Sequence, residues 1–334
     1  MEYRTFGKTG LRVSALGFGC GNVGGLIIRE EPRTRVRAVA RAIEGGINYF
    51  DTAAMYGNGQ SEQNLGQVLN ELKPDVYVGT KVRLSPQELG DIRGAIRRSV
   101  EMSLTRLGRD DVDLIQLHNH IIHHRTPGGD AEAAVTSQEV LEDVLTAFRQ
   151  LQAEGKVRFY GITGLGETAA LYDVIDSTLL HTVQVCYNLL NPSAGYRVPQ
   201  RFPSQDFGQL IDRATAQGMG TIGIRVLAAG ALSGQETRHP IAVPSVAPIG
   251  TGPEYQMDVQ QTRALTFLVE EGYASSLIEA AMRFAWSKAN LSTALVGFSS
   301  IEHLEQALAA QAKGGLPAAA LERLSQTWEQ FATA

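Results

Sequence analysis

The sequence predicts an α/β protein, a (β/α)8 TIM barrel with an N-terminal β-hairpin and a C-terminal helix. Two observations favour this fold class. Short apolar runs of strand type alternate eight times with longer stretches of helical periodicity. Several of these runs end in polar residues of catalytic type, as strands do at the C-terminal rim of such barrels. A chain of 334 residues is long enough for one barrel, so we expect residues 1–334 to form a single domain.

The composition indicates an ordinary soluble globular protein. Hydrophobic residues make up 43% of the chain and charged residues 19%, and the net charge of −5 is spread without long like-charge runs, which argues against nucleic-acid binding. No stretch is apolar enough for a membrane span, and the charged N-terminus lacks the apolar core of a signal peptide. We expect a cytoplasmic protein with small-molecule partners. The oligomeric state is unknown from the sequence.

The first expected element is a hairpin, because residues 3–14 alternate polar and apolar around the turn signal Lys8-Thr9-Gly10. The eight strands are expected to begin near Leu16, Ile47, Val76, Val112, Arg158, Thr182, Thr221 and Ala294. The helices that follow them are expected at 32–45, 61–72, 86–107, 137–154, 167–177, 205–217, 260–289 and 301–312. Start signals at Pro32 and Ser85-Pro86, and glycines where helices should end, support these bounds.

Two long irregular stretches, 119–136 and 228–258, follow predicted strands and therefore belong to the catalytic face of the barrel. Loops of this length in compact domains are usually functional or disordered. The tail at 316–331 has apolar residues at helical spacing, which predicts a final helix that covers hydrophobic surface. Cys20 and Cys186 lie in apolar runs, where buried, reduced thiols are expected.

One motif supports a competing fold. Residues 19–24 spell the G-x-G-x-x-G of a dinucleotide-binding turn, which would favour an open doubly wound sheet. The next helix is expected to open only near Pro32, well after the last glycine, so a phosphate would not lie at its N-terminus. We therefore interpret this segment as a flexible first loop of a barrel.

Polar residues end three successive apolar runs: Asp51, Lys81 and His118. Tyr56 follows Asp51 by five residues in a glycine-rich loop. The ends of neighbouring parallel strands lie about 5 to 10 Å apart, so these side chains should converge. Any one of them alone is more often structural, as an ion pair, a core histidine or a packing tyrosine. Their placement on successive strand ends favours catalysis.

The chemistry of this group indicates proton transfer. A lysine beside a carboxylate stays charged and favours the phenolate, which should lower the pKa of Tyr56 and make it a general acid. A neutral His118 is expected to donate a hydrogen bond to a carbonyl oxygen. No serine or cysteine has an obvious partner base, so the nucleophile should come from a bound cofactor, and hydride suits that role.

Four blocks resemble the signatures of the aldo-keto reductase superfamily: residues 11–19, residues 46–53 with Tyr56-Gly57, residues 78–81 and residues 113–118. The resemblance extends over nearly the whole chain. It implies a catalytic tetrad of Asp51, Tyr56, Lys81 and His118, with Tyr56 as the proton donor. The implied activity is NAD(P)(H)-dependent reduction of aldehydes or ketones to alcohols, or the reverse oxidation.

The resemblance also implies a cofactor site. Thr163 and Gln184 match contacts to the nicotinamide carboxamide, whereas Gly164 lacks the side-chain amide that the family has there. Residues 225–232 resemble the pyrophosphate segment and residues 297–307 the adenosine 2'-phosphate segment. The implied cofactor-binding residues are Thr163, Gln184, Arg225, Leu227, Gly230, Leu232, Gly297, Ser299, Ser300, His303 and Gln306.

The choice between NADP(H) and NAD(H) depends on the last segment. Phe298 and Ser300 occupy positions where relatives often carry Lys or Arg, and His303 stands where Arg is frequent. The groups left for a 2'-phosphate are the hydroxyls of Ser299 and Ser300, backbone donors and a mostly neutral histidine. We expect NADP(H), with NAD(H) a close competitor and weak discrimination between them.

Three further histidines, His120, His123 and His124, lie near His118 in the sequence and allow a metal site. The resembled family needs no metal, so we expect none and assign these histidines to substrate recognition, together with aromatic and apolar residues of the 239–256 loop. Two alternative functions remain: a cofactor-binding regulatory or channel-associated subunit of the same fold, and an NAD-dependent aldose dehydrogenase. The sequence gives neither the physiological substrate nor the preferred direction.

Overall fold

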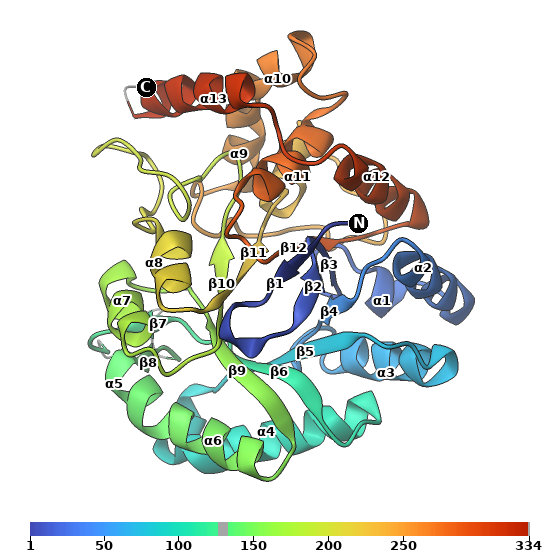
Figure 1. Cartoon of the computed structure of the whole chain (residues 1–334), viewed down its shortest axis with the longest axis vertical. Helices are drawn as coiled ribbons and strands as arrows, with labels where there is room; N and C mark the ends of the chain where they lie inside the picture. Colours follow the sequence, from blue (N-terminus) through green and yellow to red (C-terminus); the bar gives the residue numbers. More distant parts are fainter. Residues whose placement is uncertain (126–132, 333–334) are drawn as a thin grey trace.

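Eight parallel strands close into a barrel in the computed structural model, which describes residues 1–125 and 133–332. The strands in order around the barrel are β3 (Leu16–Gly19), β4 (Tyr49–Asp51), β5 (Tyr77–Val82), β6 (Val112–Leu117), β9 (Val157–Thr163), β10 (Thr182–Cys186), β11 (Gly220–Ile224) and β12 (Thr293–Gly297). The closing pair places Leu16 opposite Ala294. Helices surround the strands (Figure 1), and the predicted (β/α)8 fold class is confirmed.

The predicted hairpin is present and packs against one end of the barrel. Strands β1 (Tyr3–Thr5) and β2 (Arg12–Ser14) pair antiparallel. The hairpin contributes Phe6, Leu11 and Val13 to a cluster whose other buried members are interior residues of the barrel, among them Tyr49 and Leu114. Because only Ala15 separates β2 from the first residue of β3, the hairpin covers the N-terminal end of the strands. The opposite, C-terminal end remains available for a site.

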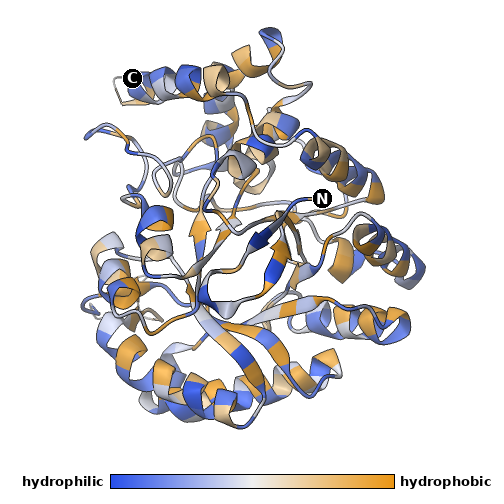
Figure 2. Ribbon diagram, viewed as in Figure 1, coloured by the Kyte–Doolittle hydropathy of each residue, from blue (hydrophilic) through white to orange (hydrophobic). Residues whose placement is uncertain are grey.

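Several helices agree with the expected bounds. These are α2 (Pro32–Glu44), α3 (Gln60–Leu72), α7 (Thr168–Asp176), α12 (Ile301–Ala312) and the C-terminal α13 (Ala318–Phe331). Figure 2 shows hydrophobic residues along the strands, while the helices carry hydrophilic residues on one side. The last helix buries Leu324 and Trp328, and the Trp328 indole donates to Leu189 O at 2.9 Å. It covers hydrophobic surface as predicted.

Two predicted helices are divided into shorter elements. The segment expected at 86–107 is a 3-10 helix (Pro86–Asp91) followed by α4 (Ile92–Leu107), because the Asp91 side chain caps a new N-terminus by accepting from Gly94 N. The segment expected at 137–154 consists of α5 (Ser137–Glu139), a π-helical turn (Val140–Val144) and α6 (Leu145–Ala153).

The helix expected at 205–217 is shorter and begins later, as α8 (Leu210–Ala216). Polar groups of the segment after β10 hold the residues before it in a non-helical path. Asn191 Nδ2 donates to Gln205 O at 2.8 Å, Phe207 N donates to Ser193 Oγ at 2.9 Å, and Gln209 has a left-handed φ of 59°.

The prediction of one long helix at 260–289 is wrong. The segment forms α9 (Tyr255–Gln261), a 3-10 helix (Thr262–Leu265), α10 (Phe267–Glu270) and α11 (Leu277–Ser287). Gly272 takes a φ of 78° after α10, and Ser276 then starts α11 by accepting a hydrogen bond from Glu279 N. The apolar periodicity continues across Gly272 and Ser276, so it predicted one helix in spite of these stop and start signals.

Both long loops contain short elements. The stretch 119–136 holds the parallel pair β7 (Ile121–Ile122) and β8 (Val135–Thr136), and its residues 126–132 lie outside the described residues. The stretch 228–258 begins with a 3-10 helix (Ala228–Ser233) and ends in α9. A four-residue helix that the sequence did not predict, α1 (Leu26–Arg29), follows the first glycine-rich loop.

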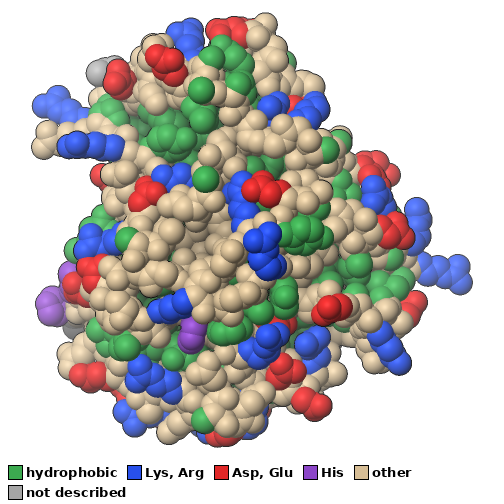
Figure 3. Space-filling view, in the orientation of Figure 1, with side chains coloured by type: hydrophobic (Ala, Val, Ile, Leu, Met, Phe, Trp, Pro, Cys, Tyr) green, Lys and Arg blue, Asp and Glu red, His purple; other side chains and the backbone are tan. Residues whose placement is uncertain are grey.

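The described helices include none that is both long and apolar enough to cross a membrane. Charged side chains of both signs are interspersed on the face seen in Figure 3.

Candidate active site

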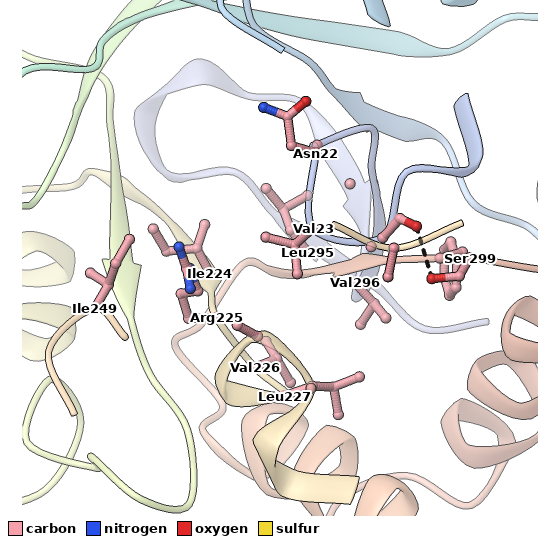
Figure 4. Close-up of a pocket in the computed structure, with 18 of the residues that line it drawn as sticks. Asn22, Val23, Ile224, Arg225, Val226, Leu227, Ile249, Leu295, Val296 and Ser299 are labelled. Carbon is pink, nitrogen blue, oxygen red and sulfur yellow. Dashed lines mark hydrogen bonds between the residues drawn. The ribbon is translucent and has the colours of Figure 1, made fainter. Parts of the chain in front are cut away.

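A cavity of about 800 Å³ lies at the C-terminal ends of the strands. This volume is in the range of small-molecule sites. Its walls come from the first βα loop, the ends of β4 to β6, the segment after β11, and β12 with the start of α12. Figure 4 shows part of it, with Val23, Leu295 and Val296 on one side and the segment Arg225–Leu227 nearby.

The structure brings the four predicted catalytic residues together: Asp51, Tyr56 and His118 line this cavity, and Lys81 is buried beside them. Asp51 ends β4 and Lys81 lies in the neighbouring β5, and the two buried side chains form an ion pair. Lys81 Nζ also donates to Thr52 O at 2.7 Å. The same nitrogen lies 4.9 Å from the centroid of the Tyr56 ring, and the ring centroids of Tyr56 and His118 are 6.2 Å apart.

Burial sets the protonation states of the phenol and the imidazole. Burial, reinforced by the charges of Lys81 and Arg83, lowers the pKa of His118 to about 3, so this ring is neutral, as predicted. Burial also raises the pKa of Tyr56, and the charge of Lys81 opposes this rise without cancelling it. The expected net lowering of the Tyr56 pKa is therefore wrong, because desolvation of the phenolate outweighs the nearby cation. Tyr56 is protonated at neutral pH.

A chain of hydrogen bonds joins the ion pair to the histidine. Gln184 Nε2 donates to Asp51 Oδ2 at 2.8 Å, Thr163 Oγ1 donates to Gln184 Oε1 at 3.4 Å, and His118 Nδ1 lies 2.8 Å from Thr163 Oγ1. The sequence assigned Thr163 and Gln184 to the cofactor. In the structure both contact members of the predicted tetrad.

The direction of each hydrogen bond in this chain follows from the first one. A carboxylate accepts only, so the amide NH2 of Gln184 faces Asp51 and its carbonyl oxygen faces Thr163. The hydroxyl of Thr163 donates to that oxygen and therefore accepts from Nδ1–H of His118. A neutral ring protonated at Nδ1 has a bare Nε2. This assignment makes Nε2 an acceptor, whereas the sequence led us to expect a donor to a carbonyl oxygen.

Most of the residues expected to bind the cofactor line the cavity. They are Gln184, Arg225, Leu227, Gly230, Gly297, Ser299, His303 and Gln306. Three others do not line it. Thr163 lies behind His118, Leu232 is buried in the hydrophobic core, and Ser300 caps α12 by accepting from His303 N.

The two serine hydroxyls expected to receive a 2'-phosphate are engaged within the protein. Ser299 Oγ donates to Gly24 O at 2.8 Å (Figure 4), which ties the first βα loop to the end of β12. Ser300 Oγ accepts from the backbone of α12 and also hydrogen-bonds to the Glu302 side chain. Both hydroxyls already have partners within the protein, and their expected contact with a 2'-phosphate stays a prediction.

The segment after β11 places positive charge on the cavity wall. Arg225, Ala228 and Ala229 all have left-handed φ values, 57°, 45° and 59°, a strained path for residues other than glycine that is often found at functional sites. Arg225 Nη1 donates to Ala247 O at 3.2 Å, and Arg238 donates to the carbonyls of Ala229 and Val243, both at 2.7 Å. Neither arginine pairs with a carboxylate of the described chain. This donor set fits the phosphates of a dinucleotide.

The residues of the cavity wall that sequence reasoning missed include two that hold backbone groups in place. Arg238 is one of them. Its position as a cation inside the long loop after the seventh strand was the sequence signal that could have indicated a phosphate-binding role. Asn22 is the other, and its Oδ1 accepts from Gly57 N at 2.9 Å beside Tyr56. Arg29 of α1 donates to the carbonyls of Asn22 and Ile241, which links the first loop to the 239–256 loop. These contacts anchor a loop that we expected to be flexible.

The three additional histidines do not form one site. His120 lines the cavity, whereas His123 contacts Asp173 outside it, with Nε2 at 2.8 Å from Oδ2. Neither His123 nor His124 is part of the cavity wall. Within residues 1–125 and 133–332 there is no group of three or more side chains suited to hold a metal ion. The 239–256 loop contributes His239, Ala242, Ile249 and Tyr255 to the wall.

Comparison with known proteins identifies the family. A model described as the aldo/keto reductase family matches residues 15–329. The chain belongs to this family. As an aldo/keto reductase it is an oxidoreductase, and the resemblance found in its sequence blocks is confirmed.

Relatives match over most of the chain. An L-galactose dehydrogenase of Arabidopsis thaliana is 29% identical over 319 residues, which cover 93% of this chain and 88% of the relative. An L-glyceraldehyde 3-phosphate reductase of Escherichia coli K12 is 26% identical over 330 residues, covering 92% and 86%. The holo form of an aldo-keto reductase from Bacillus halodurans superposes with a TM-score of 0.69 at 23% identity, covering 99% and 96% of the two chains, which shows the shared fold.

Proposed function

We propose that this protein interconverts aldehydes or ketones with alcohols, with Tyr56 as the general acid in reduction and the general base in oxidation. The observation that carries the proposal is a protonated phenol at the cavity beside Lys81, whose charge is held by Asp51. A bound nicotinamide cofactor supplies or accepts the hydride in such a reaction.

Each residue of the group has a defined task in this proposal. Tyr56 gives its proton to the oxygen that becomes the alcohol, and Lys81 stabilises the phenolate left behind. Asp51 keeps the buried ammonium charged. His118 is neutral and offers Nε2 as an acceptor, so it can orient the hydroxyl of an alcohol or of Tyr56 without adding charge to the cavity.

NADP(H) is the cofactor we propose, with NAD(H) a close competitor. Arg225 and Arg238 suit the phosphates, and the segment 297–306 suits the adenosine end. Because that segment lacks Lys and Arg side chains to select a 2'-phosphate, it is compatible with both cofactors.

Two relatives bear on the alternatives. The L-galactose dehydrogenase matches 93% of this chain and favours a trial of the oxidative direction with aldoses. A probable voltage-gated potassium channel subunit beta of Arabidopsis thaliana is 33% identical but matches only 35% of this chain, so a regulatory subunit is the weaker alternative.

The test is turnover of a panel of aldehydes with NADPH and NADH, and of aldoses with the oxidised cofactors. Tyr56→Phe should lower carbonyl reduction by about a hundredfold or more while cofactor affinity stays near that of the wild type, because only the proton donor is removed. Tyr273→Phe, a tyrosine outside the cavity, is the matched control. Activity of the Tyr56 variant within a few-fold of wild type would refute the proposed role.

A cytoplasmic location is proposed on the state of the cysteines. Cys20 and Cys186 are free and buried. Free thiols suit a reducing compartment. Burial raises the pKa of Cys186 to about 12 and raises that of Cys20 further, so both thiols are unreactive.

A further inference from the structure

Arg83 places a positive charge at the substrate side of the cavity. It follows β5 directly, two residues after Lys81. Alternate residues of a strand point to the same side, so Arg83 lies on the side of Lys81 but about 6 to 7 Å nearer to solvent. It lines the cavity together with Met55, Tyr56, His118 and His120.

The backbone on both sides of Arg83 is fixed by the neighbouring strand end. His118 N donates to Val82 O at 2.8 Å. The buried Asn119 side chain then accepts from Leu84 N at 2.8 Å and donates to Leu84 O at 2.8 Å. Arg83 therefore extends from a backbone position held by hydrogen bonds, although its side chain is exposed.

The guanidinium of Arg83 has no carboxylate partner in the described chain. Its one polar contact there is Nη1 to Met55 Sδ at 4.0 Å. The charge of Arg83 nevertheless acts electrostatically on His118, the predicted catalytic histidine. Together with burial and the charge of Lys81, it lowers the pKa of His118. Arg83 is thus a cation that faces the catalytic group and leaves its hydrogen-bond donors available.

The charge balance of the cavity wall favours an anion. Asp51 is the only carboxylate among the described lining residues, and Lys81 already neutralises it. Arg225 and Arg238, the other lining arginines, donate to backbone carbonyls in the segment after β11. A bidentate arginine recognises carboxylate and phosphate groups through charge and paired donors.

We propose that Arg83 forms an anion subsite, and that the preferred substrates are carbonyl compounds with a carboxylate or phosphate group a few bonds from the carbonyl carbon. This inference rests on the proposed carbonyl reductase function and adds the substrate class to it. Arg83 determines specificity, and the proton transfer itself belongs to Tyr56.

The test compares matched substrates that differ only in the anionic group. Succinic semialdehyde is paired with butanal for the carboxylate, and glycolaldehyde phosphate is paired with glycolaldehyde for the phosphate. In the wild type, kcat/KM should be at least about tenfold higher for the charged member of one pair or both, and added salt should reduce the advantage. The pair with the larger ratio identifies which anion is preferred.

Arg83→Met should lower this ratio by about 10- to 100-fold, mainly through KM, and Arg83→Lys should restore part of it. The ratio cancels any general effect of the substitution on His118. Arg33→Met, an exposed arginine of α2 outside the cavity, is the control and should leave the ratio unchanged. A wild-type ratio near one, or a ratio that Arg83→Met does not alter, overturns the subsite. Failure to turn over any of the four aldehydes refutes the proposed function instead.

Discussion

Lys81 keeps a positive charge in the barrel interior because the lost hydration is replaced by fixed partners. Its side chain is 0% exposed and burial lowers its pKa, but Asp51 and Tyr56 together outweigh burial, so the pKa of Lys81 is raised. The ammonium also donates to Thr52 O. In the proposed reaction such a pair would stabilise the phenolate of Tyr56 without reorganisation. Loss of one partner leaves the other as an uncompensated buried charge.

Lys81→Met should abolish most carbonyl reduction, by about a hundredfold or more, because the phenolate loses its counter-charge. The variant should also be less stable by about 3–5 kcal/mol, since Asp51 is left unpaired. The double variant Asp51→Asn with Lys81→Met removes both charges and should regain stability without regaining activity. Steady-state kinetics and urea unfolding measure the two effects. An active double variant would contradict the role of the cation.

Thr163 fixes the tautomer of His118 in our assignment of the hydrogen bonds. Thr163→Val keeps the shape and removes the acceptor of Nδ1–H, so the ring proton should move from Nδ1 to Nε2. Nitrogen NMR of the labelled protein without cofactor distinguishes the two tautomers. Thr182→Val is the control, because the buried Thr182 hydroxyl has no hydrogen-bond partner among the residues that the structure describes. The assignment is wrong if wild type and Thr163→Val show the same tautomer.

At the scale of elements, we expect the junction of β12 and α12 to determine how well the two nicotinamide cofactors are distinguished. Its serines are engaged in capping and loop contacts. The ring of His303 lies 5.4 Å from that of His239, measured between centroids, and burial together with His239 lowers the pKa of His303. A neutral histidine is a weak partner for a phosphate dianion.

We therefore expect NADPH to be preferred over NADH by less than roughly a thousandfold, which corresponds to about 4 kcal/mol. Fluorescence titration with both cofactors gives the ratio of dissociation constants. A larger preference would mean that a cation from another segment reaches the phosphate, and Arg225→Met and Arg238→Met would then show which one. The control is Arg33→Met on the outer helix α2.

Helices α11 and α12 are joined by a carboxylate whose effect depends on pH. Glu279 of α11 accepts from Ser275, from Arg283 at 3.0 Å and from Lys313, just after α12, at 2.7 Å. Burial alone raises the pKa of Glu279, but these hydrogen bonds outweigh it and lower the pKa to about 2. A carboxyl group with a depressed pKa stabilises the fold above its ordinary value of 4.5, and this stabilisation is lost as the pH falls from 4.5 towards 2.

Glu279→Gln should cost about 1–3 kcal/mol of unfolding free energy at pH 7, because hydrogen bonds to a charged acceptor are lost. The difference from wild type should shrink as the pH is lowered below 4.5. Urea unfolding at several pH values measures it. Glu322→Gln, an exposed residue of α13, is the control and should have little effect. A cost that does not vary with pH would point to packing rather than charge.

For the whole molecule, one end of the barrel is closed by the hairpin and the other holds the candidate site. Phe6 is 1% exposed and meets the Tyr49 ring edge-on, with centroids 5.6 Å apart.

Phe6→Ala should destabilise the protein by about 3–5 kcal/mol through the cavity it leaves, while kcat of the folded fraction stays near wild type. Met102→Ala, an exposed apolar residue, is the control. Loss of kcat in folded Phe6→Ala would show that the two ends are coupled.

The sequence by itself determined the barrel and the convergence at its C-terminal rim of the four residues that we propose to be catalytic. Alternation of apolar runs and helical periodicity is a local property, and the rule that parallel strand ends share one rim then places Asp51, Lys81 and His118 together. The same local rules failed where periodicity ran past a helix break, as at Gly272.

Only the tertiary structure decided what those residues contact. The hydrogen bond from Gln184 to Asp51 joins residues 133 positions apart, and the bond from Ser299 to Gly24 joins residues 275 apart. Such contacts exist because the barrel closes, and no local pattern encodes their distance or direction. Closure likewise determines burial, and burial reversed the expected shift in the pKa of Tyr56 and left the charge of Arg83 facing the cavity.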